Sequence, residues 1–363
     1  MRLGVLDIGS NTVHLLLVDA HPGARPVPFA SHKRPLSLVQ FLESDGSIND
    51  AGQHELIEFV LEAWEFAAKH KAEDLLAFCT SAIREATNGP AVLARVKHET
   101  TVTLQELTGS EEASMTFFAV RRWYGWGAGP ILNLDIGGGS FEMAYGEDEL
   151  PELATSVPLG ASRLTRDWLQ EDPPSAKSVK ELRRYIRTTL KPVVRDFEKL
   201  GKANHVAGTS KTFRSLARIA GAAPSAAGPY VKRELFSTDL GLWAQRISAM
   251  EVEDRLNLPG VSEARAPQLL AGALVADRVR VTVRGESGGP VGLRLGLGPS
   301  EDVARESSKQ RVGRLRGAQS FVSEAFEVRM GAGTGDRVRP ADEHRGDGAH
   351  PSHFRHGSCE RDR

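Results

Sequence analysis

The hydrophobic residues of this chain follow two patterns that alternate as far as about residue 277. Nearly unbroken apolar runs are typical of buried strands, and apolar residues spaced three or four apart are typical of amphipathic helices. The runs predict strands at residues 3–7, 12–20, 75–79, 101–107, 131–135, 141–145 and 205–207, with a polar turn at 80–84. The spaced patterns predict helices at residues 50–68, 110–123, 160–169, 176–200, 211–220, 238–250 and 264–275. This alternation indicates an α/β fold.

The length of 363 residues suits two domains. We place their boundary near residue 125, which gives an N-terminal α/β lobe at 1–125 and a C-terminal α/β lobe at 126–277. Beyond residue 277 the periodicity fades, although a strand pattern survives at 279–283. Glycine and arginine dominate the rest, so we predict an atypical tail at 278–363 that is largely disordered from about residue 300.

Composition excludes several classes of protein. Hydrophobic residues make up 40% and charged residues 26% of the chain, as in globular proteins. The net charge of −1 gives no global basic field for nucleic acid. A buried-strand pattern begins directly after Met1 and Arg2, which leaves no room for a secretion signal, and the longest apolar run near the start, residues 15–18, cannot span a bilayer. We therefore expect a cytoplasmic protein that binds neither nucleic acid nor membrane.

One motif occurs twice. Residues 7–12 read DIGSNT and residues 135–140 read DIGGGS, each between two predicted strands and 128 positions apart. The small residues let successive backbone N–H groups approach an anion, and the aspartate can hold a divalent cation. A single such turn is weak support because Asp and Gly are common in hairpins. Two matched copies at domain spacing predict turns that grip one phosphate from both sides of a cleft.

The motifs resemble, in order, those of the exopolyphosphatase / guanosine pentaphosphate phosphohydrolase (Ppx/GppA) family, and the chain is most similar to its short bacterial exopolyphosphatases. They lie at residues 7–12, 81–84, 109–113, 135–142, 156–165 and 208–212. The resemblance covers about residues 1–277. It implies the two-lobed actin/Hsp70/sugar-kinase-like (ribonuclease H-like) fold, in which two related α/β lobes enclose an interdomain cleft.

Glu112 is the predicted catalytic residue. From the residues alone, Glu111 and Glu112 follow Gly109 at a helix start, where the helix dipole favours carboxylates, so a purely structural role is open. The resemblance implies instead that Glu112 orients and deprotonates the attacking water. Hydrolysis of a phosphoanhydride needs such a base together with charge stabilisation.

The resemblance also implies the residues that bind phosphate and metal. Arg84 is expected to contact phosphate, although an ion pair with Glu85 is the simpler alternative. The other expected phosphate ligands are Gly9, Ser10, Asn11, Thr12, Gly137, Gly138, Gly139, Ser140, Thr209 and Ser210. The expected ligands of Mg²⁺, the implied cofactor, are Asp7, Asp135 and Glu142. Hairpin capping remains the alternative for both aspartates, and an exposed strand position remains the alternative for Glu142.

Several basic residues of the second lobe could line a path for a long polyanion, or could form a solvated surface. They are Arg163, Arg166, Arg183, Arg184, Arg187, Arg214 and Arg218. Trp123, Tyr124 and Trp126 are expected to pack at the domain junction. No histidine pair has the helical spacing of a zinc site with a partnering glutamate, so a zinc enzyme is disfavoured.

The implied function is hydrolysis of terminal phosphate from inorganic polyphosphate. The alternatives are hydrolysis of guanosine pentaphosphate (pppGpp) or a nucleotide, phosphoryl transfer to an acceptor, and binding of alarmone or polyphosphate without catalysis. The family allows a homodimer, which no residue pattern here demonstrates.

The tail departs from the family pattern. Residues 278–363 hold 16 basic residues, of which 15 are arginine, and nothing in them matches the segment that normally closes the second lobe. We hypothesise that the reading frame shifts near residue 277, which would remove an interior strand of the second lobe. Finding the closing segment in another frame of the gene would support this hypothesis, and its absence there would contradict it.

Overall fold

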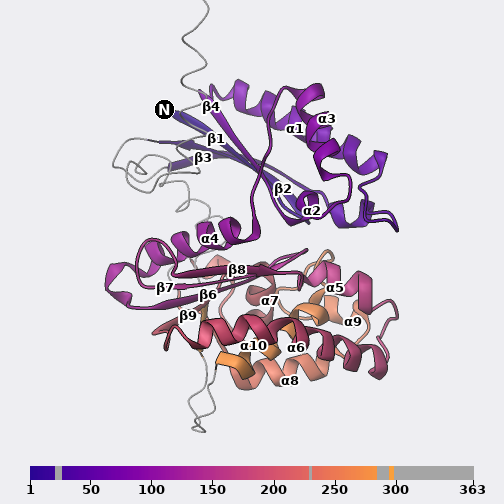
Figure 1. Cartoon of the computed structure of the whole chain (residues 1–363), viewed down its shortest axis with the longest axis vertical. Coiled ribbons are helices and arrows are strands. Elements are labelled where there is room, and N and C mark those ends of the chain that lie inside the picture. The colour runs from indigo at the N-terminus through magenta and orange to yellow at the C-terminus, as the bar shows by residue number, and fades with distance from the viewer. Residues whose placement is uncertain (21–26, 229–230, 284–293, 298–363) are drawn as a thin grey trace, which may run out of the picture. The chain divides into compact units, whose positions relative to one another are not determined.

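The computed structural model describes residues 1–20, 27–228, 231–283 and 294–297. All of them lie in one of two compact units of the chain, Met1–Arg314. Most of the predicted tail at 278–363 lies outside the described residues, and its predicted disorder stays a prediction. The described residues form an α/β fold with two sheets (Figure 1).

The first sheet has the strand order β3-β2-β1-β4-β5. Its strands are β1 (Arg2–Ile8), β2 (Thr12–Asp19), β3 (Val27–Pro35), β4 (Asp74–Cys79) and β5 (Gln105–Glu106). The first three are antiparallel, whereas β4 is parallel to β1 and β5 is parallel to β4. Helices α1 (Asp50–Lys69) and α3 (Gly89–Thr100) lie side by side (Figure 1) and bury Leu56, Val60 and Val96 with Leu6 and Ile8 of β1. A short helix, α2 (Ser81–Arg84), follows β4 where we predicted a polar turn.

The second sheet has the order β10-β11-β9-β6-β7-β8. Its strands are β6 (Ile131–Ile136), β7 (Phe141–Gly146), β8 (Leu153–Val157), β9 (His205–Gly208), β10 (Glu234–Phe236) and β11 (Arg294–Leu297). Strands β6 to β8 are antiparallel, and β9 and β11 continue the sheet in parallel. The order β8-β7-β6-β9-β11 therefore repeats the order β3-β2-β1-β4-β5 of the first sheet. This internal repeat confirms the predicted fold of two related α/β halves.

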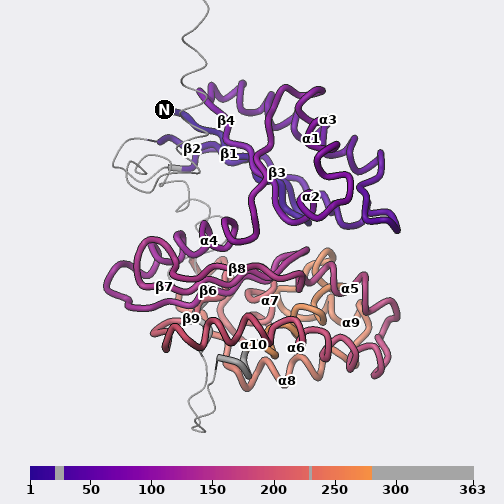
Figure 2. The backbone as a smooth tube through the Cα atoms, viewed as in Figure 1, coloured from indigo at the N-terminus to yellow at the C-terminus, as the bar shows by residue number. Residues whose placement is uncertain are grey.

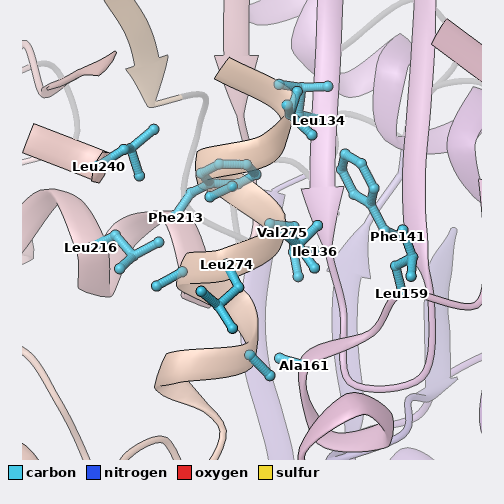
Figure 3. Close-up of a cluster of buried hydrophobic side chains, with 14 of the residues drawn as sticks. Leu134, Ile136, Phe141, Leu159, Ala161, Phe213, Leu216, Leu240, Leu274 and Val275 are labelled. Carbon is cyan, nitrogen blue, oxygen red and sulfur yellow. The ribbon is translucent and has the colours of Figure 1, made fainter. Parts of the chain in front are cut away.

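Helices cover both faces of the second sheet (Figures 1 and 2). One face packs against α4 (Gly109–Tyr124) through Ala113, Phe117 and Val120. The helices on the other face are α5 (Ala161–Trp168), α6 (Ala176–Glu198), α7 (Lys211–Ile219), α8 (Ser237–Ile247) and α10 (Leu269–Val283), and the short α9 (Val252–Leu256) precedes α10. Figure 3 shows the core on that face, where Phe213 and Leu274 pack beside Leu134 and Phe141.

One expectation about the region after residue 277 is wrong. Residues 279–283, predicted as a strand, belong to α10, because the packing of Val279 in the second core outweighs its β-propensity. The second sheet also has an interior strand after residue 277, since β11 pairs with β9 on one side and β10 on the other. Without β11, the edges of β9 and β10 that face it would expose unpaired backbone N–H and C=O groups. The short strand β11 forms hydrogen bonds with these groups. These findings do not test the reading frame itself.

Candidate functional site

The two predicted turns have the same local geometry. The first turn, residues 9–12, connects β1 to β2, and the N–H of Gly9 donates to the carbonyl of Thr12 at 3.0 Å. The second turn, residues 137–140, connects β6 to β7, and the N–H of Gly137 donates to the carbonyl of Ser140 at 2.9 Å. The sequence repeat is therefore also a repeat of backbone conformation.

The two turns lie against each other. A methyl group on Gly138 would lie 2.5 Å from Nδ2 of Asn11, and one on Gly139 would lie 3.2 Å from Oγ of Ser10. A third contact comes from α2, because the Ser81 hydroxyl is 2.8 Å from the Ser10 hydroxyl and both side chains are buried. The two turns are therefore adjacent, as a shared phosphate site would require, and the binding of phosphate between them stays a prediction.

Arg84 and Glu112 meet beside the turns. Thr80 donates its N–H to the carbonyl of Ile8 at 3.2 Å, which fixes α2, and Arg84 at its end, next to the first turn. Nη1 of Arg84 donates to the carbonyl of Leu107 at 2.7 Å and to Oε2 of Glu112 at 3.3 Å. The guanidinium is therefore held at the start of α4, and its Nη2 lies 4.0 Å from Oε1 of Glu85.

The start of α4 separates the roles of its two adjacent glutamates. The hydroxyl of Thr108 accepts a hydrogen bond from the N–H of Glu111, and the Glu111 carboxylate accepts one from the N–H of Thr108 at 2.7 Å. This capping box satisfies the helix terminus. Glu111 therefore takes the structural role that the sequence left open for both residues, and Glu112 pairs with Arg84.

The site concentrates negative charge. Burial, together with the smaller effects of the Asp7 and Asp135 charges, raises the pKa of Glu112 to about 7 against the opposing effect of Arg84. Burial, followed by the charges of Glu112 and Asp135, raises the pKa of Glu142 well above its usual range. Four carboxyl groups therefore influence one another, and a cation or a proton would relieve their repulsion.

Hydroxyl groups hold two of the predicted metal ligands. Thr209 donates its hydroxyl hydrogen to Oδ2 of Asp135 at 2.6 Å, and Ser156 donates to Oε1 of Glu142 at 2.8 Å. Glu142 is buried, so the exposed strand position that was its alternative is wrong. Among the residues that the structure describes, however, no group of three His, Cys, Asp or Glu side chains is arranged to hold a metal ion.

Thr209 and Ser210, in the turn after β9, make different hydrogen bonds. Thr209, predicted to bind phosphate, orients Asp135 through the hydrogen bond above. Ser210 caps α7, where its hydroxyl accepts the N–H of Phe213 at 3.4 Å. Binding of phosphate by these two residues stays a prediction.

Of the seven arginines considered as a polyanion path, Arg163 reaches the second turn. Its Nε donates to the carbonyl of Gly139 at 2.9 Å, and its guanidinium pairs with Glu85. Arg166 pairs with Asp167 and Arg183 with Asp277 on the helical side of the second half. Arg218 donates to the carbonyl of Ala222.

Sequence reasoning missed a hydrogen-bonded group behind the first turn. Oδ1 of Asn11 lies 3.1 Å from the Ser162 hydroxyl, and Oε1 of Gln268 lies 2.6 Å from the same hydroxyl. Ser162 stands in one of the family-like motifs, whereas nothing in the sequence marks Gln268, which is 257 residues away from Asn11. These contacts fix the Asn11 amide at the second turn.

A pocket of about 340 Å³ adjoins Arg84. It is lined by residues from α2, the start of α4 and the end of β8, namely Arg84, Glu85, Gly109, Ser110, Ala154, Thr155, Ser156, Val157 and Pro158. The lining includes the cationic Arg84 and the hydroxyl-bearing residues Ser110, Thr155 and Ser156. Such groups can pair with and donate hydrogen bonds to the oxygen atoms of a polyanion.

Comparisons with known proteins point to one family. A model of the Ppx/GppA phosphatase family matches residues 17–285. The chain is 53% identical over 278 residues to exopolyphosphatase 1 of Mycobacterium tuberculosis, which covers 76% of this chain and 80% of that protein. It is 51% identical over 277 residues to exopolyphosphatase 1 of Mycobacterium leprae, covering 76% and 82% respectively.

Solved structures support the fold. An exopolyphosphatase from Cytophaga hutchinsonii matches with a TM-score of 0.71 and 22% identity, covering 85% of this chain and 96% of that one. A Ppx/GppA protein of Aquifex aeolicus matches with a TM-score of 0.67 and 22% identity, covering 86% and 98%. Fold and site together define an α/β protein of two related halves whose equivalent turns lie against each other. The chain belongs to the Ppx/GppA phosphatase family, as the motifs predicted.

The remaining predictions concern the membrane, the domain boundary, the location and the oligomeric state. No described helix combines the length and the apolar character that crossing a membrane requires. The domain boundary near residue 125, the cytoplasmic location and the homodimer stay predictions.

Proposed function

We propose that the chain is an exopolyphosphatase that releases the terminal phosphate of inorganic polyphosphate. The observation that carries this proposal is the contact between the two turns beside the Arg84–Glu112 pair. Identity of 53% to a protein named exopolyphosphatase 1 supports the same assignment, and with it the predicted phosphoanhydride hydrolase activity.

The terminal phosphate binds at the N–H groups of both turns, with Arg84 beside it. Glu112 accepts a proton from a water molecule while the water oxygen forms a bond to the terminal phosphorus. The bond from that phosphorus to the bridging oxygen breaks, and the shortened chain leaves as an anion. Because polyphosphate is a good leaving group, no strong general acid is required. A pKa of about 7 suits Glu112 to this task at neutral pH.

Mg²⁺ is the cofactor we propose. Its fit rests on the donor set, because Asp7, Asp135 and Glu142 offer oxygen atoms among carboxyl groups that repel one another. Mg²⁺ usually takes one or two carboxylates together with substrate phosphates, so a complete protein cage is not required. When bound, it would neutralise charge on the phosphate oxygens.

The test is phosphate release from polyphosphates of several chain lengths, pppGpp, ATP and ADP, each with Mg²⁺ and with EDTA. We expect release from polyphosphate, its loss in EDTA and its return when excess Mg²⁺ is added. Preference for pppGpp would favour the guanosine pentaphosphate alternative. Transfer to an acceptor without hydrolysis would favour the phosphotransferase, and binding without release would favour the non-catalytic protein.

A further inference from the structure

The Glu85 carboxylate occupies an unusual position for a site that binds a polyanion. It lines the pocket beside Arg84, where an incoming phosphate chain would meet its negative charge. Oε1 of Glu85 lies 4.0 Å from Nη2 of Arg84, and Oε2 pairs with the guanidinium of Arg163. Two arginines therefore converge on one carboxylate at the edge of the site.

Both arginines also contact the phosphate-binding machinery. Arg84 pairs with Glu112 at 3.3 Å, and Arg163 donates through Nε to the carbonyl of Gly139 in the second turn. The Glu85 carboxylate thus lies next to both the candidate base and the second turn. A phosphate group presents the same kind of anionic oxygen to a guanidinium as a carboxylate does.

A substrate chain brings more phosphates than the turns hold. Once the terminal phosphate is between the turns, the next phosphates must leave along the edge of the site. The pocket of about 340 Å³ adjoins Arg84 there and adds the hydroxyl groups of Ser110 and Thr155. If a substrate phosphate replaces the Glu85 carboxylate, Arg84 and Arg163 still have an anionic partner. The exchange therefore avoids the free-energy penalty of leaving a partly buried guanidinium unpaired.

We propose that this pocket binds the second and third phosphates of the substrate chain, and that Glu85 is a built-in anion which these phosphates displace from Arg84 and Arg163. The inference rests on the proposed function for the identity of the substrate. It makes Glu85 and Arg163 determinants of chain-length specificity, since orthophosphate fills the turns without reaching the pocket.

The test measures binding, so that it is independent of turnover. Tripolyphosphate and orthophosphate are titrated calorimetrically into full-length Glu112→Gln protein, alone and combined with Glu85→Gln, Arg163→Gln or Arg166→Gln. Glu85→Gln should tighten tripolyphosphate binding by about threefold to tenfold, and Arg163→Gln should weaken it by a similar factor. Arg166→Gln is the matched control, because Arg166 lies on the same helix and pairs with Asp167, and it should change neither affinity.

Unchanged or weaker tripolyphosphate binding in Glu85→Gln, with an unaltered melting temperature, would overturn the proposal and leave Glu85 as a structural ion-pair partner. An equal change in orthophosphate affinity would also overturn it, because that result indicates a general charge effect. Tighter tripolyphosphate binding in a protein whose wild type releases no phosphate would support the pocket and contradict only the proposed hydrolase activity.

Discussion

At the scale of single residues, the site depends on carboxyl groups held where water cannot fully stabilise their charge. Glu112 matters most for the proposed reaction, because burial raises the pKa of its carboxyl group to about 7 while Arg84 opposes that rise. An ordinary glutamate with a pKa near 4.5 would be a weaker base at neutral pH.

The first prediction concerns the pH dependence of the reaction. Glu112 must be deprotonated to accept a proton, so kcat/KM for polyphosphate should rise with pH through an apparent pKa of about 7. The measurement is a pH–rate profile, with the pKa of the substrate's terminal phosphate determined separately by ³¹P NMR. A profile that is flat from pH 6 to pH 8 would contradict the assignment of Glu112 as the base.

The second prediction concerns stability. The fold favours the protonated form of Glu112, so this residue lowers stability progressively as the pH rises from 4.5 through about 7. The neutral substitution Glu112→Gln should therefore stabilise the protein without Mg²⁺ by about 1–3 kcal/mol at pH 8 and by much less at pH 4. Urea unfolding at the two pH values measures this difference, and a destabilised variant at pH 8 would contradict it.

At the scale of elements, the second turn is held by the segment that follows β8. Ala161 donates its N–H to the carbonyl of Gly137 at 2.9 Å, and Arg163 donates its N–H to the carbonyl of Gly138 at 3.0 Å. Gly160 makes this approach feasible, because a methyl group there would lie 2.2 Å from the carbonyl carbon of Gly139. The start of α5 thus sets the conformation of the second turn.

The third prediction follows from this contact. Gly160→Ala should lower the free energy of unfolding by about 1–3 kcal/mol, because backbone atoms must move to admit the methyl group. It should also raise KM for polyphosphate, since the displaced atoms belong to the second turn. Gly127→Ala is the matched control, with no atom within 4 Å of its new methyl group. Equal stabilities for the two variants, measured by urea unfolding, would contradict the argument.

Local sequence patterns predicted many of these elements. The apolar run at 131–135 and the spacing at 110–123 correspond to β6 and α4, because each element buries the face that its pattern marks. The strand expected at 101–107 was reduced to Gln105–Glu106, and 279–283 became helical. Strand propensity depends on tertiary packing, which is not visible in a short window of sequence.

At the scale of the whole molecule, the repeated strand order explains why two similar turns occur in equivalent positions of the two halves. Each turn connects the first two strands of its sheet, so equivalent positions in the two halves place the turns in contact. The repeated motif made this prediction possible from sequence alone. Glu85–Arg163 and Asn11–Gln268 could not be predicted in this way, because each pair joins residues far apart in the chain.

The measurement that tests the central claim most directly is the rate of orthophosphate release from long-chain polyphosphate by the wild type and by Glu112→Gln. We predict release by the wild type and a loss of at least about 100-fold in the variant, as expected when a general base is removed. Both proteins should still bind tripolyphosphate, because the two turns remain intact. Equal rates for the two proteins would contradict the role of Glu112, and no release by a folded wild type with Mg²⁺ would contradict the proposed function.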